Sequence, residues 1–297
     1  MWSSDPTITR QLPVLYRMLV GYWGLVGRLL PSRRARPPGG AALGRLVVKV
    51  STRLGLRTKV ALRIDGRILH IDLADLRFAM VIGELTGGGT VAGALRGLLG
   101  PGDTYIDAGA NSGGYVGYAI GLIGPTGIVI AFEPQPRLAA LVAQTLASND
   151  VNGEVHQVAL GDARGTVTLR VPEGRTGEAS IHATEGEAID VTLARLDDLV
   201  PVQLPGRVVM KIDVEGHEIP LLRGALNAIR RHRPTLIIEI NPAALTDAGL
   251  PERALLDWLD EHDFRIAELG HPDRWLAPGG ADPGRQRDVL AQLSDAA

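Results

Sequence analysis

The sequence has 297 residues, of which 45% are hydrophobic and 22% are charged. This balance excludes wholesale disorder and allows one large domain with an appendage, and the absence of cysteine excludes disulfide bonds, thiolate metal sites and cysteine nucleophiles. The net charge of −2 conceals a division, because the stretch Pro6–Ile64 has twelve Arg and Lys residues and no Asp or Glu, which indicates an N-terminal segment that meets an anionic surface.

The stretch Leu12–Leu30 predicts a helix that is apolar on nearly all sides but contains two arginines. Its uncharged centre, Met18–Gly27, is shorter than the roughly 20 apolar residues of a membrane span. Two interpretations stay open: a helix in the surface of an anionic membrane, or a helix packed on the protein's own core or on a second subunit of a homo-oligomer. We expect a basic N-terminal segment at 1–57 and a catalytic domain at 58–297, in a cytoplasmic protein that residues 1–40 could hold on the inner face of the membrane.

Downstream, the pattern changes to alternating strands and helices. Two alternating runs in Val60–Leu73 flank Asp65-Gly66, which is typical of a β-hairpin. Five later apolar runs predict strands: Thr104–Ala108, Ile128–Phe132, Val155–Leu160, Val208–Ile212 and Leu236–Ile240. Three helices are predicted between them, and one further hairpin: Gly114–Leu122, Arg137–Ser148, Glu218–Arg231, and Thr166–Val171 with Ala188–Leu193. Strands separated by helices imply a parallel sheet covered on both faces, which is an α/β doubly wound fold.

A glycine-rich turn follows the first of these strands, at the place where doubly wound folds bind ligands. Asp107 precedes the turn, and the next strand ends in Glu133, which can accept both ribose hydroxyls of an adenosine. A dinucleotide site would have a glycine at Asn111 and no acid beside the pyrophosphate. The acid favours the amino group of S-adenosylmethionine over NAD, although an NAD-dependent oxidoreductase and a plain helix-capping turn are the alternatives.

Charged residues follow the predicted strand Val208–Ile212. Because residues two apart share one face of a strand, Lys211, Asp213 and Glu215 line up, and charges are costly to bury without partners. They therefore indicate a cleft, with an ion pair of Lys211 to Asp213 or Glu239 as the structural alternative.

The end of the last predicted strand adds oxygen ligands to this rim. Glu239 and Asn241, together with Asp213, could hold Mg²⁺ or bind sugar hydroxyls directly. His217 is the candidate general base for a hydroxyl. The remaining six histidines are interpreted as surface or structural residues: His70, His156, His182, His232, His262 and His271.

Several motifs in one order resemble the FkbM family of methyltransferases, over roughly Gly102 to Asn241. They are Ile106–Gly113, Phe132–Pro134, Ala159–Asp162, Arg195–Leu199, Lys211–Glu218 and Leu221–Gly224. The resemblance implies a Rossmann-like methyltransferase fold, here with a basic helical extension and a hairpin before the core. It also implies S-adenosylmethionine as the donor and a hydroxyl of a sugar, glycolipid or polyketide product as the acceptor.

The resemblance also implies roles for individual residues. The methionine end, the ribose and the adenine would be held by Asp107, Gly109, Ala110, Asn111, Gly113, Glu133, Pro134, Leu160, Gly161 and Asp162. The transfer site would be lined by Lys211, Asp213 and Glu215. The family often has a small residue at His217, so the role of this histidine as a base is inferred from its chemistry alone.

Two further interpretations are weaker. A non-catalytic membrane-surface module with a degenerate cofactor fold would not need Asp107, Glu133 and Asp213 together. Nucleic-acid methylation is suggested by the basic N-terminus, but the catalytic half is acidic and lacks an aromatic platform for a flipped base. We therefore expect a hydroxylated small molecule or a glycolipid, and no nucleic acid, as the partner.

Overall fold

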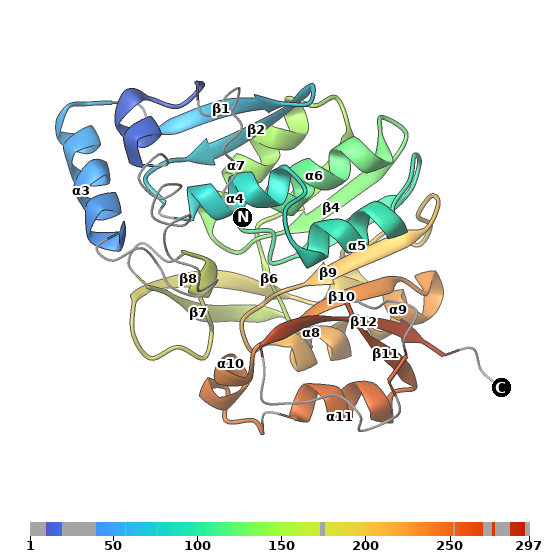
Figure 1. The fold of residues 1–297 in the computed structure, drawn as a ribbon. Coiled ribbons are helices and arrows are strands. Elements are labelled where there is room, and N and C mark those ends of the chain that lie inside the picture. Colours follow the sequence, from blue (N-terminus) through green and yellow to red (C-terminus); the bar gives the residue numbers. More distant parts are fainter. Residues whose placement is uncertain are drawn as a thin grey trace.

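The computed structural model describes residues 10–19, 40–56, 58–75, 77–172, 176–251, 253–269, 275–276 and 286–294. Its centre is a seven-stranded sheet in the order β11-β12-β10-β9-β3-β4-β5 (Figure 1). The strands are β3 (Thr104–Ala108), β4 (Ile128–Phe132), β5 (Asn152–His156), β9 (Val208–Ile212), β10 (Thr235–Ile240), β11 (Phe264–Glu268) and β12 (Arg287–Leu293). The five strands from β10 to β5 are parallel, and β12 is antiparallel to both of its neighbours. The predicted doubly wound α/β fold is confirmed.

Helices cover both faces of this sheet because successive residues of its buried strands point to opposite sides. One face is covered by α5 (Thr90–Leu98), α6 (Gly114–Ile123) and α7 (Pro136–Ala147), and the other by α8 (Glu218–Gly224), α9 (Leu226–His232) and α11 (Ala254–Glu261). Tyr105 and Val209 belong to the apolar cluster on the side of α5, α6 and α7, whereas Ile106 and Met210 belong to the cluster on the side of α8, α9 and α11. The two clusters form the core around the sheet.

An N-terminal layer packs beside this core. It comprises the helical residues 14–19, α3 (Gly40–Arg53), the hairpin β1 (Lys59–Ile64) and β2 (Arg67–Asp72), and α4 (Phe78–Leu85). The hairpin confirms the turn predicted at Asp65-Gly66. Leu12, Tyr16 and Leu19 are buried in one cluster with hairpin and α4 side chains, so this part of the predicted N-terminal helix packs on the protein itself. The rest of that prediction, residues 20–30, lies outside the described residues.

Two sequence predictions are wrong in detail. The predicted strand Val155–Leu160 is two strands: β5 ends at His156, and β6 (Ala159–Leu160) joins a separate three-stranded sheet with β8 (Glu187–Ala194) and β7 (Gly165–Val171). The predicted helix Glu218–Arg231 is broken at Ala225, where a Cβ on the preceding Gly224 would lie 1.9 Å from the carbonyl oxygen of Gly161.

Candidate active site

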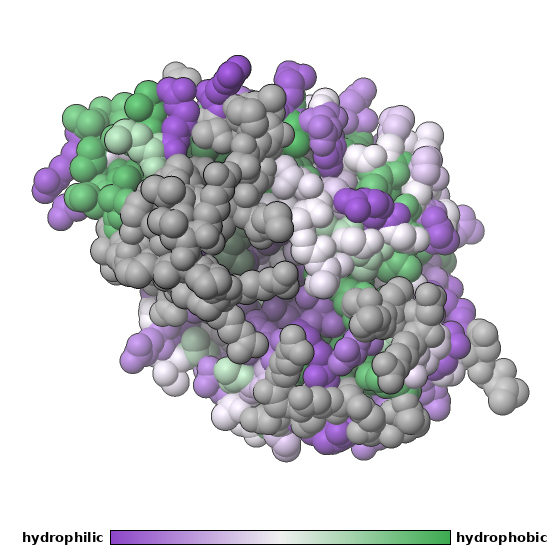
Figure 2. Space-filling model, viewed as in Figure 1, coloured by the Kyte–Doolittle hydropathy of each residue, from purple (hydrophilic) through white to green (hydrophobic). Residues whose placement is uncertain are grey.

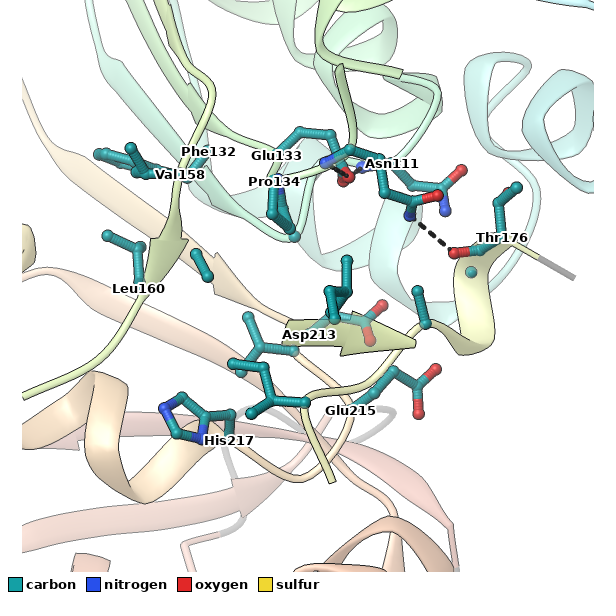
Figure 3. Close-up of a pocket in the computed structure, with 18 of the residues that line it drawn as sticks. Asn111, Phe132, Glu133, Pro134, Val158, Leu160, Thr176, Asp213, Glu215 and His217 are labelled. Atoms are coloured by element: carbon teal, nitrogen blue, oxygen red, sulfur yellow. Dashed lines mark hydrogen bonds between the residues drawn. The ribbon is translucent and has the colours of Figure 1, made fainter. Parts of the chain in front are cut away.

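A cleft with about 660 Å³ of empty space, part of it open to solvent, lies at the carboxyl ends of β3, β4 and β9. Its walls come from the residues that follow these strands, from β6, and from the 3₁₀ turn η1 (Thr176–Glu178). Figure 3 shows these side chains converging on one hollow. The position agrees with the rule that doubly wound sheets bind ligands outside the carboxyl ends of their strands.

The loop after β3 brings the cleft walls together. Gly109 has a φ of +86°, and a Cβ at this position would lie 1.9 Å from the carbonyl oxygen of Asp213. Only glycine therefore lets the loop pass so close to the end of β9. The backbone N–H groups of Gly109 and Ala110 both donate to the carbonyl oxygen of Phe132, at 3.0 Å, which joins the loop to the end of β4.

Asp107, at the end of β3, is buried beside the Tyr105 hydroxyl, and among the described residues its Oδ1 atom has no hydrogen-bond partner of normal geometry. Burial raises the pKa of this carboxyl to about 6, while Lys211, its neighbour in the sheet, acts against the rise. A buried carboxylate oxygen without a donor is costly. It therefore fits a ligand that brings a positively charged donor, such as an ammonium group.

Glu133 is fixed in the cleft wall by the backbone. Its two carboxyl oxygens accept from the N–H of Asn111 at 2.8 Å and from the N–H of Gln135 at 2.9 Å. Burial raises the pKa of Glu133 to about 7, against the effect of these two bonds. Each oxygen keeps a further lone pair, so two hydroxyl groups of a ribose could still bind there.

An apolar part of the cleft lies next to Glu133. Phe132, Pro134, Val158 and Leu160 border it (Figure 3), and their surfaces suit the flat face of an adenine. Of the other predicted cofactor residues, Gly109 and Asn111 also line the cleft, whereas Asp107, Ala110, Gly113, Gly161 and Asp162 are not among its lining residues.

Lys211 is buried and its Nζ atom lies 2.7 Å from Oδ2 of Asp213. This is the ion pair that the sequence left as the structural alternative, made with Asp213. Burial alone would raise the pKa of Asp213, but the adjacent ammonium group outweighs it and lowers the pKa. Asp213 is therefore an ionised carboxylate in the cleft wall.

Two more carboxylates stand beside Asp213. One oxygen from each of Asp213, Glu215 and Glu239 lies within 4.8 Å of the others. Burial and the charge of Asp213 raise the pKa of Glu215 to about 7, and burial together with both acids raises the pKa of Glu239 to about 9. At neutral pH the cluster therefore shares protons rather than holding three charges.

Asn241 acts on this cluster through Glu215. Its Nδ2 atom donates to Oε2 of Glu215 at 3.0 Å, and its Oδ1 atom accepts from the N–H of Ala244, at the start of α10 (Pro242–Asp247). The predicted set of Asp213, Glu239 and Asn241 thus meets at one rim, but Glu215 supplies the third carboxylate. Glu215 itself is held at a φ of +48°, where non-glycine residues are uncommon.

His217 lies away from the carboxylates. Its side chain points to the opposite side from Glu215 (Figure 3), and its Nδ1 atom lies 3.1 Å from Nε2 of His182. Burial and this second imidazole lower the pKa of His217 to about 4. A Cβ on Gly161 would lie 3.1 Å from its Nε2 atom, so the predicted general base stands near the apolar end of the cleft. The sequence did not indicate its pairing with His182.

The family model for the methyltransferase FkbM domain matches residues 107–266, more than half of the chain. The chain belongs to the FkbM methyltransferase family. No curated protein matches the chain.

Solved structures similar to this FkbM methyltransferase share little sequence with it. The FkbM methyltransferase of Methylobacillus flagellatus is 18% identical, with a TM-score of 0.36, and the alignment covers 73% of this chain and 59% of that one. A putative transferase of Pyrococcus horikoshii is 15% identical, with a TM-score of 0.42, over 96% and 95% of the two chains. An S-adenosylmethionine-dependent O-methyltransferase of Thermotoga maritima is 12% identical, with a TM-score of 0.37, over 84% and 82%.

One wall of the cleft was not indicated by the sequence. Arg77, which lies before the matched FkbM domain, and Gly177, which lies within it, line this wall. The hydroxyl of Thr176 donates to Asp75, and the carbonyl oxygen of Thr176 accepts from Nε2 of Gln135 at 2.9 Å. These bonds fasten η1 to the segment after β2 and to the segment after β4. No motif marks η1 or the segment after β2, because their contact exists only in the folded chain.

Proposed function

We propose that this FkbM methyltransferase uses S-adenosylmethionine to methylate a hydroxyl group of a sugar, glycolipid or polyketide-type acceptor. The observation that carries the proposal is the layout of one cleft. A buried carboxylate oxygen without a donor on Asp107 and the apolar wall beside Glu133 suit the cofactor. Asp213 and Glu215 line the same cleft and could orient an acceptor hydroxyl and accept its proton.

The residues present fit the cofactor. Asp107 would accept from the ammonium group, Glu133 from the ribose, and Pro134 and Leu160 would contact the adenine. S-adenosylmethionine supplies a methyl group activated by a positively charged sulfur. An NAD-dependent oxidoreductase fits less well, because the buried acid Asp107 would repel a pyrophosphate.

Glu215 is the group that we assign to the acceptor proton. A general base works best when its pKa is close to the working pH, and the pKa of Glu215 is about 7. Asp213 is paired with Lys211 and would orient the hydroxyl by accepting a hydrogen bond. As the acceptor oxygen gains the methyl group, its proton passes to Glu215. Positioning of the acceptor by the cleft walls lowers the activation barrier further, by up to about 7–11 kcal/mol in favourable cases.

The residues that would hold Mg²⁺ are Asp213, Glu215 and Glu239, through their carboxyl oxygens. One feature of this cluster favours transfer without it. Lys211 already provides a counter-ion for Asp213, so this carboxylate does not need a metal to balance its charge. We therefore propose that the acid cluster accepts a proton from the acceptor and does not hold a metal ion. EDTA should then leave turnover unchanged.

The acceptor that we propose is not a nucleic acid. Glu133, Asp213 and Glu215 line the cleft, and a phosphate backbone would meet their negative charge. Incubation of the protein with methyl-labelled S-adenosylmethionine and panels of sugars, glycolipids, polyketides and RNA tests this. Label on a hydroxyl oxygen, located by NMR, is expected. Label only on RNA, or tight binding of NAD without binding of S-adenosylhomocysteine, would contradict the proposal.

We also propose that the N-terminal layer docks on an anionic membrane. Of the seven large apolar side chains that the described residues expose, five lie between residues 14 and 56: Val14, Met18, Leu46, Leu54 and Leu56. Figure 2 shows apolar side chains over α3, with hydrophilic ones beside them, and this segment has no acid. Exposed apolar groups among basic residues suit a lipid surface. Within the described part of the chain, no helix has the length and apolar composition of a membrane span.

A further inference from the structure

Arg77 occupies the cleft wall in a position that only a glycine opposite permits. It directly precedes α4, and its backbone N–H donates to Oδ1 of Asp75 at 2.9 Å. A Cβ on Gly177 would lie 1.4 Å from Nη1 of Arg77. The guanidinium group therefore lies against the backbone of η1, and Gly177 leaves the space for it.

The side chain of Arg77 makes no hydrogen bond and no close ion pair within the described part of the chain, although burial raises the pKa of Glu84 and the charge of Arg77 acts against that rise. Its Nε atom is buried without a hydrogen bond, and none of the ion pairs involves it. Its charge still reaches the acids: burial and Asp213 raise the pKa of Glu215, and Arg77 acts against that rise. A buried donor without a partner is costly, so we expect an anion from outside the chain to bind it.

The charges of the cleft point to the same conclusion. Of the described residues that line it, Arg77 alone carries a permanent positive charge, whereas Glu133, Asp213 and Glu215 are acids. The acids suit the positive groups of a ligand. A negatively charged group of the ligand has Arg77 as its partner in the cleft.

The position of α4 brings Arg77 to the loop that follows β3. α4 packs on α6, where a Cβ on Gly114 would lie 3.1 Å from the carbonyl oxygen of Val81, and α6 begins directly after the loop 109–113. Arg77 and Asn111 consequently border one cleft. An α-amino acid carries an ammonium and a carboxylate group on the same carbon, so it needs an acid for the one and a cation for the other. Arg77 supplies the cation beside the loop 109–113, and Asp107 lies at the end of β3, which leads into this loop.

We propose that Arg77 binds the carboxylate of the amino-acid part of the cofactor, an inference that rests on the proposed use of S-adenosylmethionine. Asp107 would accept from the ammonium group of that same part. A guanidinium group pairs with a carboxylate through two parallel hydrogen bonds. Arg77 is thereby a cofactor-binding residue that lies before the matched FkbM domain.

Calorimetry of the full-length protein with two ligands tests this. S-adenosylhomocysteine has the amino-acid part, and 5′-methylthioadenosine lacks it. Arg77→Gln should weaken the binding of S-adenosylhomocysteine about 10- to 100-fold. Its affinity for methylthioadenosine should stay within about twofold of that of the wild type. The affinity of Arg77→Lys for S-adenosylhomocysteine should fall between those of the wild type and Arg77→Gln, because lysine keeps the charge but cannot form two parallel hydrogen bonds. Arg164→Gln, which removes an exposed arginine paired with Asp198, should bind both ligands as the wild type does.

The methyl ester of S-adenosylhomocysteine makes the test independent of how Arg77→Gln folds. The wild type should bind this ester at least about tenfold more weakly than the acid, and Arg77→Gln should bind the two alike. The inference is overturned if the wild type binds ester and acid equally. The inference is also overturned if Arg77→Gln weakens the binding of both adenosine ligands to the same extent, which would mean that Arg77 only supports the wall. It is overturned as well if the variant binds S-adenosylhomocysteine as the wild type does, which would assign Arg77 to an acid group of the acceptor. A wild type that binds neither ligand would overturn the proposed function itself.

Discussion

Replacing Glu215 by Gln is expected to make the protein more stable and less active. Burial of the carboxyl and the charge of Asp213 raise its pKa from 4.5 to about 7, which corresponds to about 3 kcal/mol between the charged and neutral forms. Because the folded state holds this proton more tightly than the unfolded state, the stabilisation is complete below pH 4.5 and is lost as the pH rises through about 7. The variant has no charge to bury and keeps an oxygen for Asn241.

Urea unfolding at several pH values measures this effect. At pH 8 the free energy of unfolding of Glu215→Gln should exceed that of the wild type by up to about 3 kcal/mol, and the difference should disappear toward pH 4.5. Glu187→Gln, which removes an exposed carboxylate on β8, should show no such gain. Turnover should fall about 100-fold or more if the carboxylate takes the acceptor proton, and the rise of the wild-type rate through about pH 7 should vanish with it.

The opposite signs of the two effects separate catalysis from support. A residue that only braced the strained turn would lower stability and activity together when changed. The reasoning is refuted if Glu215→Gln is no more stable than the wild type at pH 8, or if it is slower but keeps the wild-type pH profile.

Three further predictions concern the cofactor, the acid cluster and the surface. Glu133→Ala should weaken S-adenosylhomocysteine in calorimetry by about 1.5–3 kcal/mol for each hydrogen bond lost, and wild-type affinity would remove Glu133 from the site. Asp213→Ala should abolish transfer yet bind S-adenosylhomocysteine within about tenfold of the wild type, and EDTA should leave the wild-type rate unchanged, whereas loss of activity restored by Mg²⁺ would place a metal on the cluster. The double variant Met18→Glu with Leu46→Glu should abolish flotation with phosphatidylserine liposomes, and flotation of the wild type should weaken with salt. The control Val202→Glu, at an exposed apolar residue elsewhere, should float as the wild type does. Equal behaviour of the two variants would refute docking through the N-terminal layer.

The half of the cleft that we assign to the cofactor was indicated by the sequence because its residues are adjacent in the chain. The strand, the glycine-rich turn and the helix from Thr104 to Ile123 are specified by local patterns, and Glu133 follows directly from the end of the next strand. Parallel pairing of β3 with β4 then brings the two segments together. Local sequence is enough wherever the sheet itself supplies the contact.

Predictions failed where partners are distant in sequence. The run Val155–Leu160 has one apolar pattern, but β5 pairs with β4 and β6 pairs with β8, and a pattern does not reveal which strand it pairs with. α4, α5, α10, α11 and the antiparallel strands β11 and β12 were not predicted at all. The pairing of His217 with His182 was not predicted either, because the turn at Glu215 and Gly216, both at positive φ, gives no sequence signal of where the next side chain points.

The same division bears on where specificity for the acceptor arises. The matched domain, residues 107–266, contains the loop after β3, Glu133 and the acid cluster. The remaining wall, formed by Arg77 and η1, is held by the bonds of Thr176 to Asp75 and Gln135. The segment of Arg77 lies before the matched domain, and η1 lies within it, after β7. Since this wall closes the cleft beside Glu215, changes in η1 would alter which hydroxyl can reach the base, whereas changes at Arg77 would weaken binding of the cofactor.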